Sequence, residues 1–172
     1  GERVLIHAAA GGVGMAAVQI AKYLGAEVYG TASKGKWSIL KDQGLDSDHI
    51  ASSRTTEFGG LFPKQDVVLN ALANEFVDAS LGLLQSGGRF LEMGKTDVRE
   101  ISWIEEHHPG VAYEVFDISE PEISRIQGMS TQLMKLLATG DIEPLPRRVF
   151  PMSKTSQCLR FMAQAKHVGK LV

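Results

Sequence analysis

The beginning of the sequence places a glycine-rich turn between a strand pattern and a helix pattern. Residues 3–7 (RVLIH) form a short apolar run, and the small residues 8–14 (AAAGGVG) lead into an alanine-rich helical pattern that ends at Gly25. Residues 27–32 (EVYGTA) then predict a second strand. A strand, a helix and a strand within about 30 residues form a βαβ unit, which requires a right-handed parallel crossover. This feature therefore predicts a parallel sheet covered by helices.

The same alternation of strand and helix patterns continues along the chain. It is typical of an α/β fold of the Rossmann type, a doubly wound parallel sheet in a three-layer αβα arrangement. We expect this domain to span residues 1–146. Its further predicted elements are a helix at 36–43, a short strand near Ile50, a strand at 66–72, a helix at 76–85, a turn at 86–88, a strand at 89–94, a polar loop up to Gly110, a strand at 111–116 and a helix at 121–139.

The last part of the sequence, residues 147–172, has a different pattern. It predicts an extended segment at 149–151, a helix at 154–164 and the beginning of a strand at 168–172. A strand there needs a partner, and we expect a part of the chain outside this sequence to supply it. The sequence also opens directly on a core strand without an initiator Met, which suggests a segment of a longer chain.

Composition bounds the class of protein. The chain has 172 residues, 44% of them hydrophobic, which fits one globular domain. The net charge of −2 gives no basic surplus that would favour nucleic acid or an anionic membrane as a partner. No apolar run approaches the roughly 20 residues of a membrane helix. Cys158 is the only cysteine, which excludes an internal disulfide and suits the cytoplasm.

The small residues of the turn resemble a dinucleotide-binding fingerprint. In that motif the backbone approaches the pyrophosphate closely, and the helix N-terminus presents N–H groups and its positive dipole end. Here the pattern is Ala9-x-Gly11-x-x-Gly14, with alanine in place of the usual first glycine. The alternative is a tight turn that binds no ligand.

The end of the second predicted strand indicates which dinucleotide would bind. NAD sites usually place an acidic residue about 20 residues after the turn to hold the ribose 2′-hydroxyl. No acidic residue lies between Val28 and Lys41, whereas residues 31–33 (TAS) offer hydroxyls and are followed by Lys34 and Lys36. These groups suit a 2′-phosphate and favour NADP(H). The alternative is a solvated loop with incidental lysines.

Four blocks in this order resemble one known family. They are residues 7–14 (HAAAGGVG), 66–72 (DVVLNAL), 88–95 (GRFLEMGK) and 167–170 (HVGK). Together they resemble the enoyl reductase domains of modular polyketide synthases and animal fatty acid synthase, which belong to the zinc-free medium-chain dehydrogenase/reductase superfamily. The resemblance covers nearly the whole chain.

The resemblance implies a Rossmann half inserted into a GroES-like substrate-binding half, toward which residues 147–172 would return. It implies NADPH as cofactor and an α,β-enoyl thioester on an acyl carrier protein as substrate, within a synthase of many domains. In such an enzyme hydride reaches the β-carbon and a proton reaches the α-carbon. The protein would hold the nicotinamide against the β-carbon and stabilise the developing enolate.

The resemblance also implies roles for particular residues. Lys95 and Asp117 match positions proposed for the proton donor or enolate stabiliser; alternatively, Lys95 is a surface lysine and Asp117 a helix N-cap. Lys170 lies in a basic turn and could approach the cofactor. The implied cofactor-binding residues are Gly11, Gly12, Val13, Gly14, Ser33, Lys36, Asn70, Leu72 and Gly94.

No metal site is expected, because the adjacent His107 and His108 rarely chelate one ion. The strand at 111–116 is a candidate edge for pairing in a homodimer. A short-chain dehydrogenase is disfavoured, since no tyrosine has a lysine four residues later. Two other functions stay open: a stand-alone NADPH-dependent quinone oxidoreductase of the same superfamily, and a nucleotide-binding Rossmann module without catalytic activity.

Overall fold

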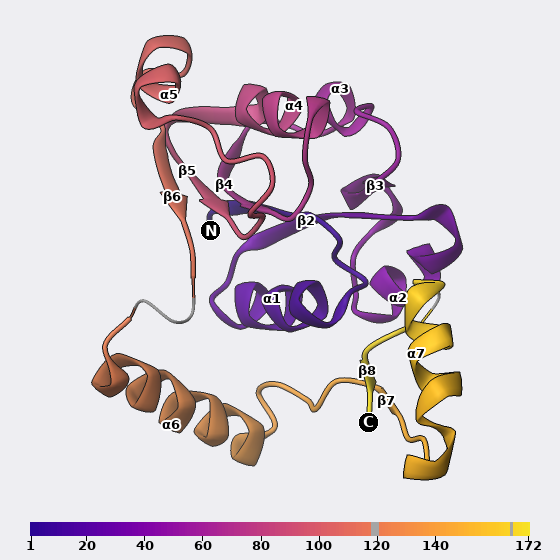
Figure 1. Cartoon of the computed structure of the whole chain (residues 1–172). Helices are drawn as coiled ribbons and strands as arrows, with labels where there is room; N and C mark the ends of the chain where they lie inside the picture. Colours follow the sequence, from indigo (N-terminus) through magenta and orange to yellow (C-terminus); the bar gives the residue numbers. More distant parts are fainter. Residues whose placement is uncertain (118–120, 166) are drawn as a thin grey trace.

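The computed structural model of the chain describes residues 1–117, 121–165 and 167–172, and its main feature is a six-stranded parallel sheet (Figure 1). The strand order is β3-β2-β1-β4-β5-β6. The chain adds β2 and β3 on one side of β1 and then β4, β5 and β6 on the other side, so the strand order reverses between β1 and β4 although all strands are parallel. This arrangement confirms the predicted doubly wound Rossmann fold. The strands are β1 (Arg3–Ile6), β2 (Glu27–Ala32), β3 (Ile50–Ser52), β4 (Gln65–Asn70), β5 (Leu84–Glu92) and β6 (Ala112–Val115).

Helices cover both faces of this sheet. Figure 1 shows α1 and α2 on one face and α3 and α4 on the other. The α-helices are α1 (Gly12–Tyr23), α2 (Trp37–Asp42), α3 (Phe58–Leu61), α4 (Glu75–Leu83), α5 (Ile101–His107), α6 (Ile123–Thr139) and α7 (Thr155–Ala163), and short 3-10 turns cover Lys34–Lys36, Ser47–His49 and Met152–Lys154.

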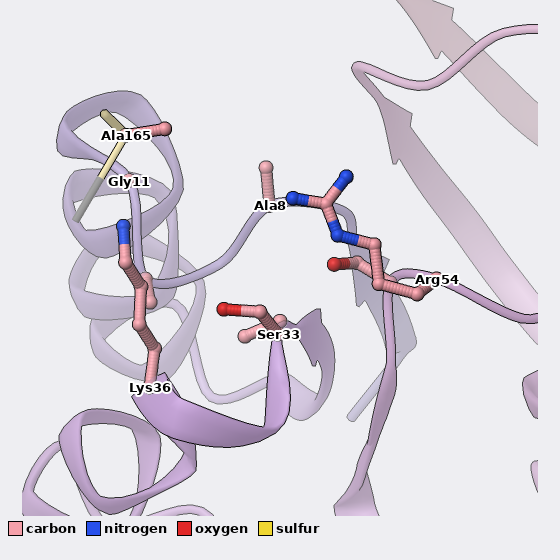
Figure 2. A pocket seen from close by; sticks show the side chains of 9 residues that line it. Ala8, Gly11, Ser33, Lys36, Arg54 and Ala165 are labelled. Atoms are coloured by element: carbon pink, nitrogen blue, oxygen red, sulfur yellow. The ribbon is translucent and has the colours of Figure 1, made fainter. Parts of the chain in front are cut away.

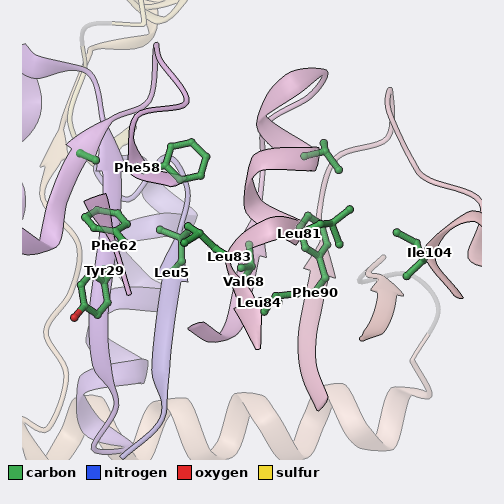
Figure 3. Close-up of a cluster of buried hydrophobic side chains, with 12 residues drawn as sticks. Leu5, Tyr29, Phe58, Phe62, Val68, Leu81, Leu83, Leu84, Phe90 and Ile104 are labelled. Carbon is green, nitrogen blue, oxygen red and sulfur yellow. The ribbon is translucent and has the colours of Figure 1, made fainter. Parts of the chain in front are cut away.

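Each face of the sheet has its own hydrophobic core. On one face, Phe58, Leu81 and Ile104 bring α3, α4 and α5 against Leu5 and Phe90 of the strands (Figure 3). On the other face, a second cluster of buried side chains packs α1 and α2 against the strands; it includes Ile6, Val18, Ala21, Val28, Leu40 and Ile50. Because both faces are covered, the chemistry of this fold is confined to the sheet edges and the loops.

Two predicted boundaries in the second half of the sheet are wrong. The predicted turn at 86–88 lies inside β5, where the pairing with β4 jumps from Leu84 to Arg89 and Gly87 has a φ of 78°. The segment predicted as a polar loop up to Gly110 contains α5, whose Ile104 is buried. This helix has only seven residues and lies in an otherwise polar stretch, so its apolar positions are too few to be recognised from sequence periodicity.

The last part of the chain forms a second, small sheet. β7 (Arg147–Arg148) pairs in parallel with β8 (Lys170–Leu171), and α7 lies between them in sequence. The expectation that the final strand has its partner outside this sequence is therefore wrong for this edge of β8, since β7 occupies it. Among the described residues, no helix is long and apolar enough to cross a membrane.

Candidate functional site

Because the six strands of the main sheet are parallel, their carboxyl ends meet at one edge. The turn after β1 lies at the centre of this edge. The loops after β2 and β3 lie on one side of it, and those after β4, β5 and β6 lie on the other. Open α/β sheets bind ligands at this edge, where the strand order reverses. The predicted site residues all belong to these loops or to the strand and helix ends beside them.

The turn after β1 brings backbone close to the first turn of α1. The Gly11 N–H donates to Ala8 O (2.8 Å), and Ala8 itself has a positive φ of 50°. A Cβ on Gly14 would lie 2.4 Å from Ala8 O and 2.6 Å from Ala9 Cα, so only glycine fits there. The tight packing leaves the N–H groups of the first turn at the carboxyl edge of the sheet, together with the positive end of the helix dipole. That combination suits a phosphate.

A pocket of about 160 Å³ lies beside this turn, at the ends of β2 and β3. Figure 2 shows Ser33, Lys36 and Arg54 around it, with Ala8 and Gly11 on the side of the glycine turn. Ser33 and Lys36 are the two residues expected here from the sequence. The pocket thus combines a hydroxyl with two cationic side chains, which suits a phosphate group.

Arg54 was not expected from the sequence. It follows the three-residue strand β3, and its backbone N–H donates to Ser52 Oγ (3.1 Å). Only the pairing of β3 with β2 brings it next to residues more than fifteen positions earlier in the chain. The sequence signal that could have identified Arg54 is a basic residue just after the short strand predicted near Ile50.

The C-terminal turn closes this region from the other side. Lys36 Nζ donates to His167 O (2.8 Å), and burial together with the charge of Arg54 lowers the pKa of Lys36. Lys170 lies against the glycine turn: a Cβ on Gly12 would come within 2.8 Å of its Nζ. A third cation therefore stands at the N-terminus of α1, where the helix dipole alone would disfavour it and an anion would offset it.

At the ends of β4 and β5, two buried polar side chains join two loops. Asn70 Nδ2 donates to Leu72 O (2.8 Å) and to Glu92 Oε2 (2.6 Å), while Asn70 Oδ1 accepts from the Leu72 N–H (3.2 Å). Glu92 Oε1 accepts from the Gly94 N–H (2.5 Å). Asn70, Leu72 and Gly94 were expected here; Glu92 was not, because a glutamate inside a strand pattern gives no sign of its burial. Burial raises the pKa of Glu92.

The two predicted catalytic residues come together at the ends of β5 and β6. Lys95 Nζ forms an ion pair with Asp117 Oδ2, with side-chain exposures of 72% for the lysine and 26% for the aspartate. The N-cap residue of α6 is Glu122, so Asp117 does not have the alternative role of capping this helix. An exposed ammonium held by a half-buried carboxylate can supply positive charge and a proton at this edge.

Nothing in the described ranges resembles a metal site. No group of three or more His, Cys, Asp or Glu side chains there could hold an ion. His107 Nδ1 is hydrogen-bonded to Trp103 O (2.9 Å), and its ring stacks on the Trp103 ring at 4.4 Å. In the part of the chain that the structure describes, the His107 ring is therefore engaged with Trp103.

Comparisons with known proteins show the family of the chain. A family described as zinc-binding dehydrogenase matches residues 45–172. The whole chain is 56% identical to part of the polyketide synthase GfsB of Streptomyces halstedii and 51% identical to part of the mycoketide-CoA synthase of Mycobacterium tuberculosis. The chain spans only 3% and 4% of the length of these two synthases.

Solved structures of reductase domains have the same fold. The CurK enoyl reductase matches 99% of this chain with a TM-score of 0.91 and 43% identity, and the chain spans 54% of it. The nucleotide-binding subdomain of the enoylreductase domain of PpsC from Mycobacterium tuberculosis matches 83% of the chain with a TM-score of 0.71 and 33% identity, and the chain spans 86% of that subdomain. The chain therefore belongs to the zinc-binding dehydrogenase family, and within it to the enoyl reductase domains of polyketide synthases.

Proposed function

We propose that this chain is the NADPH-binding part of an enoyl reductase that reduces the α,β double bond of an enoyl thioester carried on an acyl carrier protein. The observation that carries the proposal is the layout of the carboxyl edge of the sheet. A pocket with two cations lies at the ends of β2 and β3, the glycine turn lies in the centre, and the Lys95–Asp117 pair lies at the ends of β5 and β6.

Each part of this edge suits one part of an extended dinucleotide. Ser33, Lys36 and Arg54 would hold the 2′-phosphate through charge-assisted hydrogen bonds. The N–H groups after Gly11 and the ammonium of Lys170 would face the pyrophosphate. The residues that would contact the nicotinamide riboside are Asn70, Leu72 and Gly94. The relative from PpsC, a nucleotide-binding subdomain, supports this assignment.

When bound, NADPH supplies the hydride for the reduction. Lys95 would place positive charge near the thioester oxygen, which carries the negative charge of the enolate, and would deliver a proton to the α-carbon. Asp117 would hold the ammonium in place through the ion pair. A missing substrate-binding half would supply the opposite wall of the site, so we expect residues 1–172 by themselves to bind NADPH without reducing a thioester.

The partners of such an enzyme would be the other domains of a synthase. Polyketide synthases such as GfsB match over the full chain, which supports other synthase domains as partners. An acyl carrier protein would present the thioester to the site. We place the enzyme in the cytoplasm.

The test uses the complete reductase that contains this chain, with a crotonyl thioester as substrate. Lys95→Ala should lower kcat by about tenfold or more and leave the Kd for NADPH nearly unchanged, since cofactor binding is assigned to other residues. Lys41→Ala, which removes an exposed lysine at the end of α2, is the matched control and should behave like wild type.

Other outcomes would change the assignment. Loss of NADPH binding in Lys95→Ala would make Lys95 a cofactor-binding residue. Unchanged turnover would move the proton donor elsewhere. Reduction of quinones without reduction of the thioester would favour a quinone oxidoreductase, and NADPH binding without either activity would favour a non-catalytic module.

A further inference from the structure

Glu92 is a buried carboxylate for which the proposed reaction gives no direct role. It is 1% exposed, at the carboxyl end of β5. Its two oxygens have different partners: Oε2 accepts from Asn70 Nδ2 at the end of β4 (2.6 Å), and Oε1 accepts from the backbone N–H of Gly94 (2.5 Å). One carboxylate therefore joins the loop after β4 to the loop after β5.

A second carboxylate joins the same two loops farther out. Asp97 Oδ2 accepts from the Asn74 N–H (2.5 Å), and Asp97 Oδ1 accepts from Arg99 Nη1 (3.0 Å). Asn74 has a φ of 59° and a ψ of −136°, a sparsely populated conformation for a residue with a side chain, which is kept only where its surroundings fix it. Lys95 thus lies on a stretch of loop that is held on both sides, at Gly94 and at Asp97.

The chemistry of Glu92 argues against a purely stabilising role. Burying a carboxylate is costly even when it is hydrogen-bonded, and a neutral or apolar side chain would avoid that cost. Its advantage is that both of its oxygens accept hydrogen bonds. Glutamine has one acceptor oxygen and one donor NH₂, whereas Asn70 Nδ2 and the Gly94 N–H are both donors. Only the carboxylate can satisfy both loops at once.

The conformation of Gly94 depends on the same carboxylate. A Cβ on Gly94 would lie 2.7 Å from Glu92 Oε1, so any larger residue there would push the carboxylate away. The glycine lets the backbone come near enough for its N–H to reach the buried oxygen. The residue that follows it is Lys95, so the direction in which the lysine leaves the sheet edge is set at this contact.

We propose that Glu92 is a positioning residue that fixes the Lys95 loop against the end of β4, by accepting hydrogen bonds from Asn70 and from the Gly94 N–H. This inference rests on the proposed function only for the role of Lys95; the clamp itself is a property of the fold. The clamp holds the ammonium in the orientation that catalysis requires.

The first experiment measures the clamp without reference to activity. In the complete reductase, hydrogen exchange of the amides in residues 93–97 should be about five to ten times faster in Glu92→Gln than in wild type, because the variant loses one of the two bonds. Asp66→Asn is the matched control, since Asp66 also accepts from a backbone N–H, that of Arg3 (2.7 Å), but at the opposite end of the sheet. Exchange at 93–97 equal to wild type would overturn the proposal.

A second variant covers the case in which Glu92→Gln does not fold. Gly94→Ala keeps the charge of Glu92 but places a methyl group against Oε1, so it should speed exchange at the same amides. Protection equal to wild type in a folded Gly94→Ala protein would overturn the proposal as well.

The second experiment separates positioning from structure by a double-mutant cycle on kcat for the crotonyl thioester. Glu92→Gln alone should lower kcat by about tenfold with little change in KM for NADPH. In a Lys95→Ala background it should have no further effect, since no ammonium remains to be oriented. Fully additive effects of the two changes would contradict the proposed role.

Failure of the proposed function would look different. If Lys95→Ala alone left turnover unchanged, the catalytic assignment of Lys95 would fall. The exchange of residues 93–97 would still decide whether Glu92 clamps this loop.

Discussion

At the scale of single residues, burial moves the pKa values of two titratable side chains in opposite directions. His7 and Glu92 are each 1% exposed. Burial lowers the pKa of His7 to about 3 and raises the pKa of Glu92, because in both cases it disfavours the charged form. The stability of the fold should therefore depend on pH through both residues, with opposite signs.

The hydrogen bonds of His7 define its neutral form. Ser80 Oγ donates to Phe76 O (2.6 Å), so it accepts from His7 Nε2 (2.7 Å), and Nδ1 is left to accept from Thr31 Oγ1 (2.8 Å). The folded pKa lies below the ordinary value of 6.5, so the stability that neutral His7 contributes is complete above pH 6.5. It is lost progressively as the pH falls from 6.5 toward about 3.

We predict that His7→Gln flattens the loss of stability between pH 6.5 and 4. The free energy of unfolding, measured by urea denaturation across this range, should fall more steeply with acidification in wild type than in the variant. Parallel curves for the two proteins would mean that His7 is not buried in its neutral form.

Glu92 gives a prediction of the opposite sign. Its folded pKa is raised, so its favourable contribution is present at low pH and is lost as the pH rises through that pKa. Burial is the main cause of the raised pKa of Glu92; the hydrogen bonds from Asn70 and from the Gly94 N–H lower this pKa, and the charge of Asp97 raises it. The stability of wild type relative to Glu92→Gln, measured as the difference in unfolding free energy, should therefore increase as the pH falls from above neutrality toward the ordinary carboxyl value of 4.5. A difference that is constant with pH would contradict the burial of the carboxylate.

At the scale of helices and strands, a local structure could be predicted from the sequence where the residues that determine it are contiguous. The glycine turn and the helix after it were predictable because Gly11 and Gly14 lie together between two regular patterns. The irregular pairing of β5 was not, because the same glycines that mark a turn also allow a bulge inside a strand. Arg54 and Glu92 were missed because their roles come from strand pairing, which brings residues from separate loops together.

The packing of α1 on the turn after β1 gives a direct test. Gly14→Ala should destabilise the fold by about 1 to 3 kcal/mol, because its Cβ meets backbone atoms that move only if α1 shifts. Gly128→Ala is the control: apart from the backbone of α6 itself, no atom would lie within 4 Å of the new Cβ, so it should stabilise the fold by about 0.5 to 1 kcal/mol. Urea denaturation measures both, and a neutral Gly14→Ala would show that the turn is looser than described.

At the scale of the whole molecule, the sheet leaves β6 at one of its edges. The Phe116 N–H donates inward to Glu92 O (2.8 Å), and alternate residues of a strand point their N–H groups to opposite sides, so the N–H of Val115 points away from β5. This edge is the one for which we expect pairing with a second copy about a two-fold axis.

The homodimer is testable by sedimentation of the complete reductase. Wild type should sediment as a dimer at micromolar concentration, and Val115→Pro should shift it to a monomer, because proline removes an outward N–H without removing a bond to β5. A wild-type monomer, or a Val115→Pro dimer as stable as wild type, would rule out pairing through β6.

The measurement that tests the account most directly is the titration of NADPH and NADH on the complete reductase. The cations around the pocket at β2 and β3 should make NADPH bind at least about tenfold more tightly. Changing Arg54 or Lys36 to Ala should each remove about 1 to 3 kcal/mol of this preference, while Lys34→Ala, at an exposed neighbouring lysine, should leave it intact. Equal affinities for the two cofactors in wild type, or a preference that survives loss of both Lys36 and Arg54, would contradict the account.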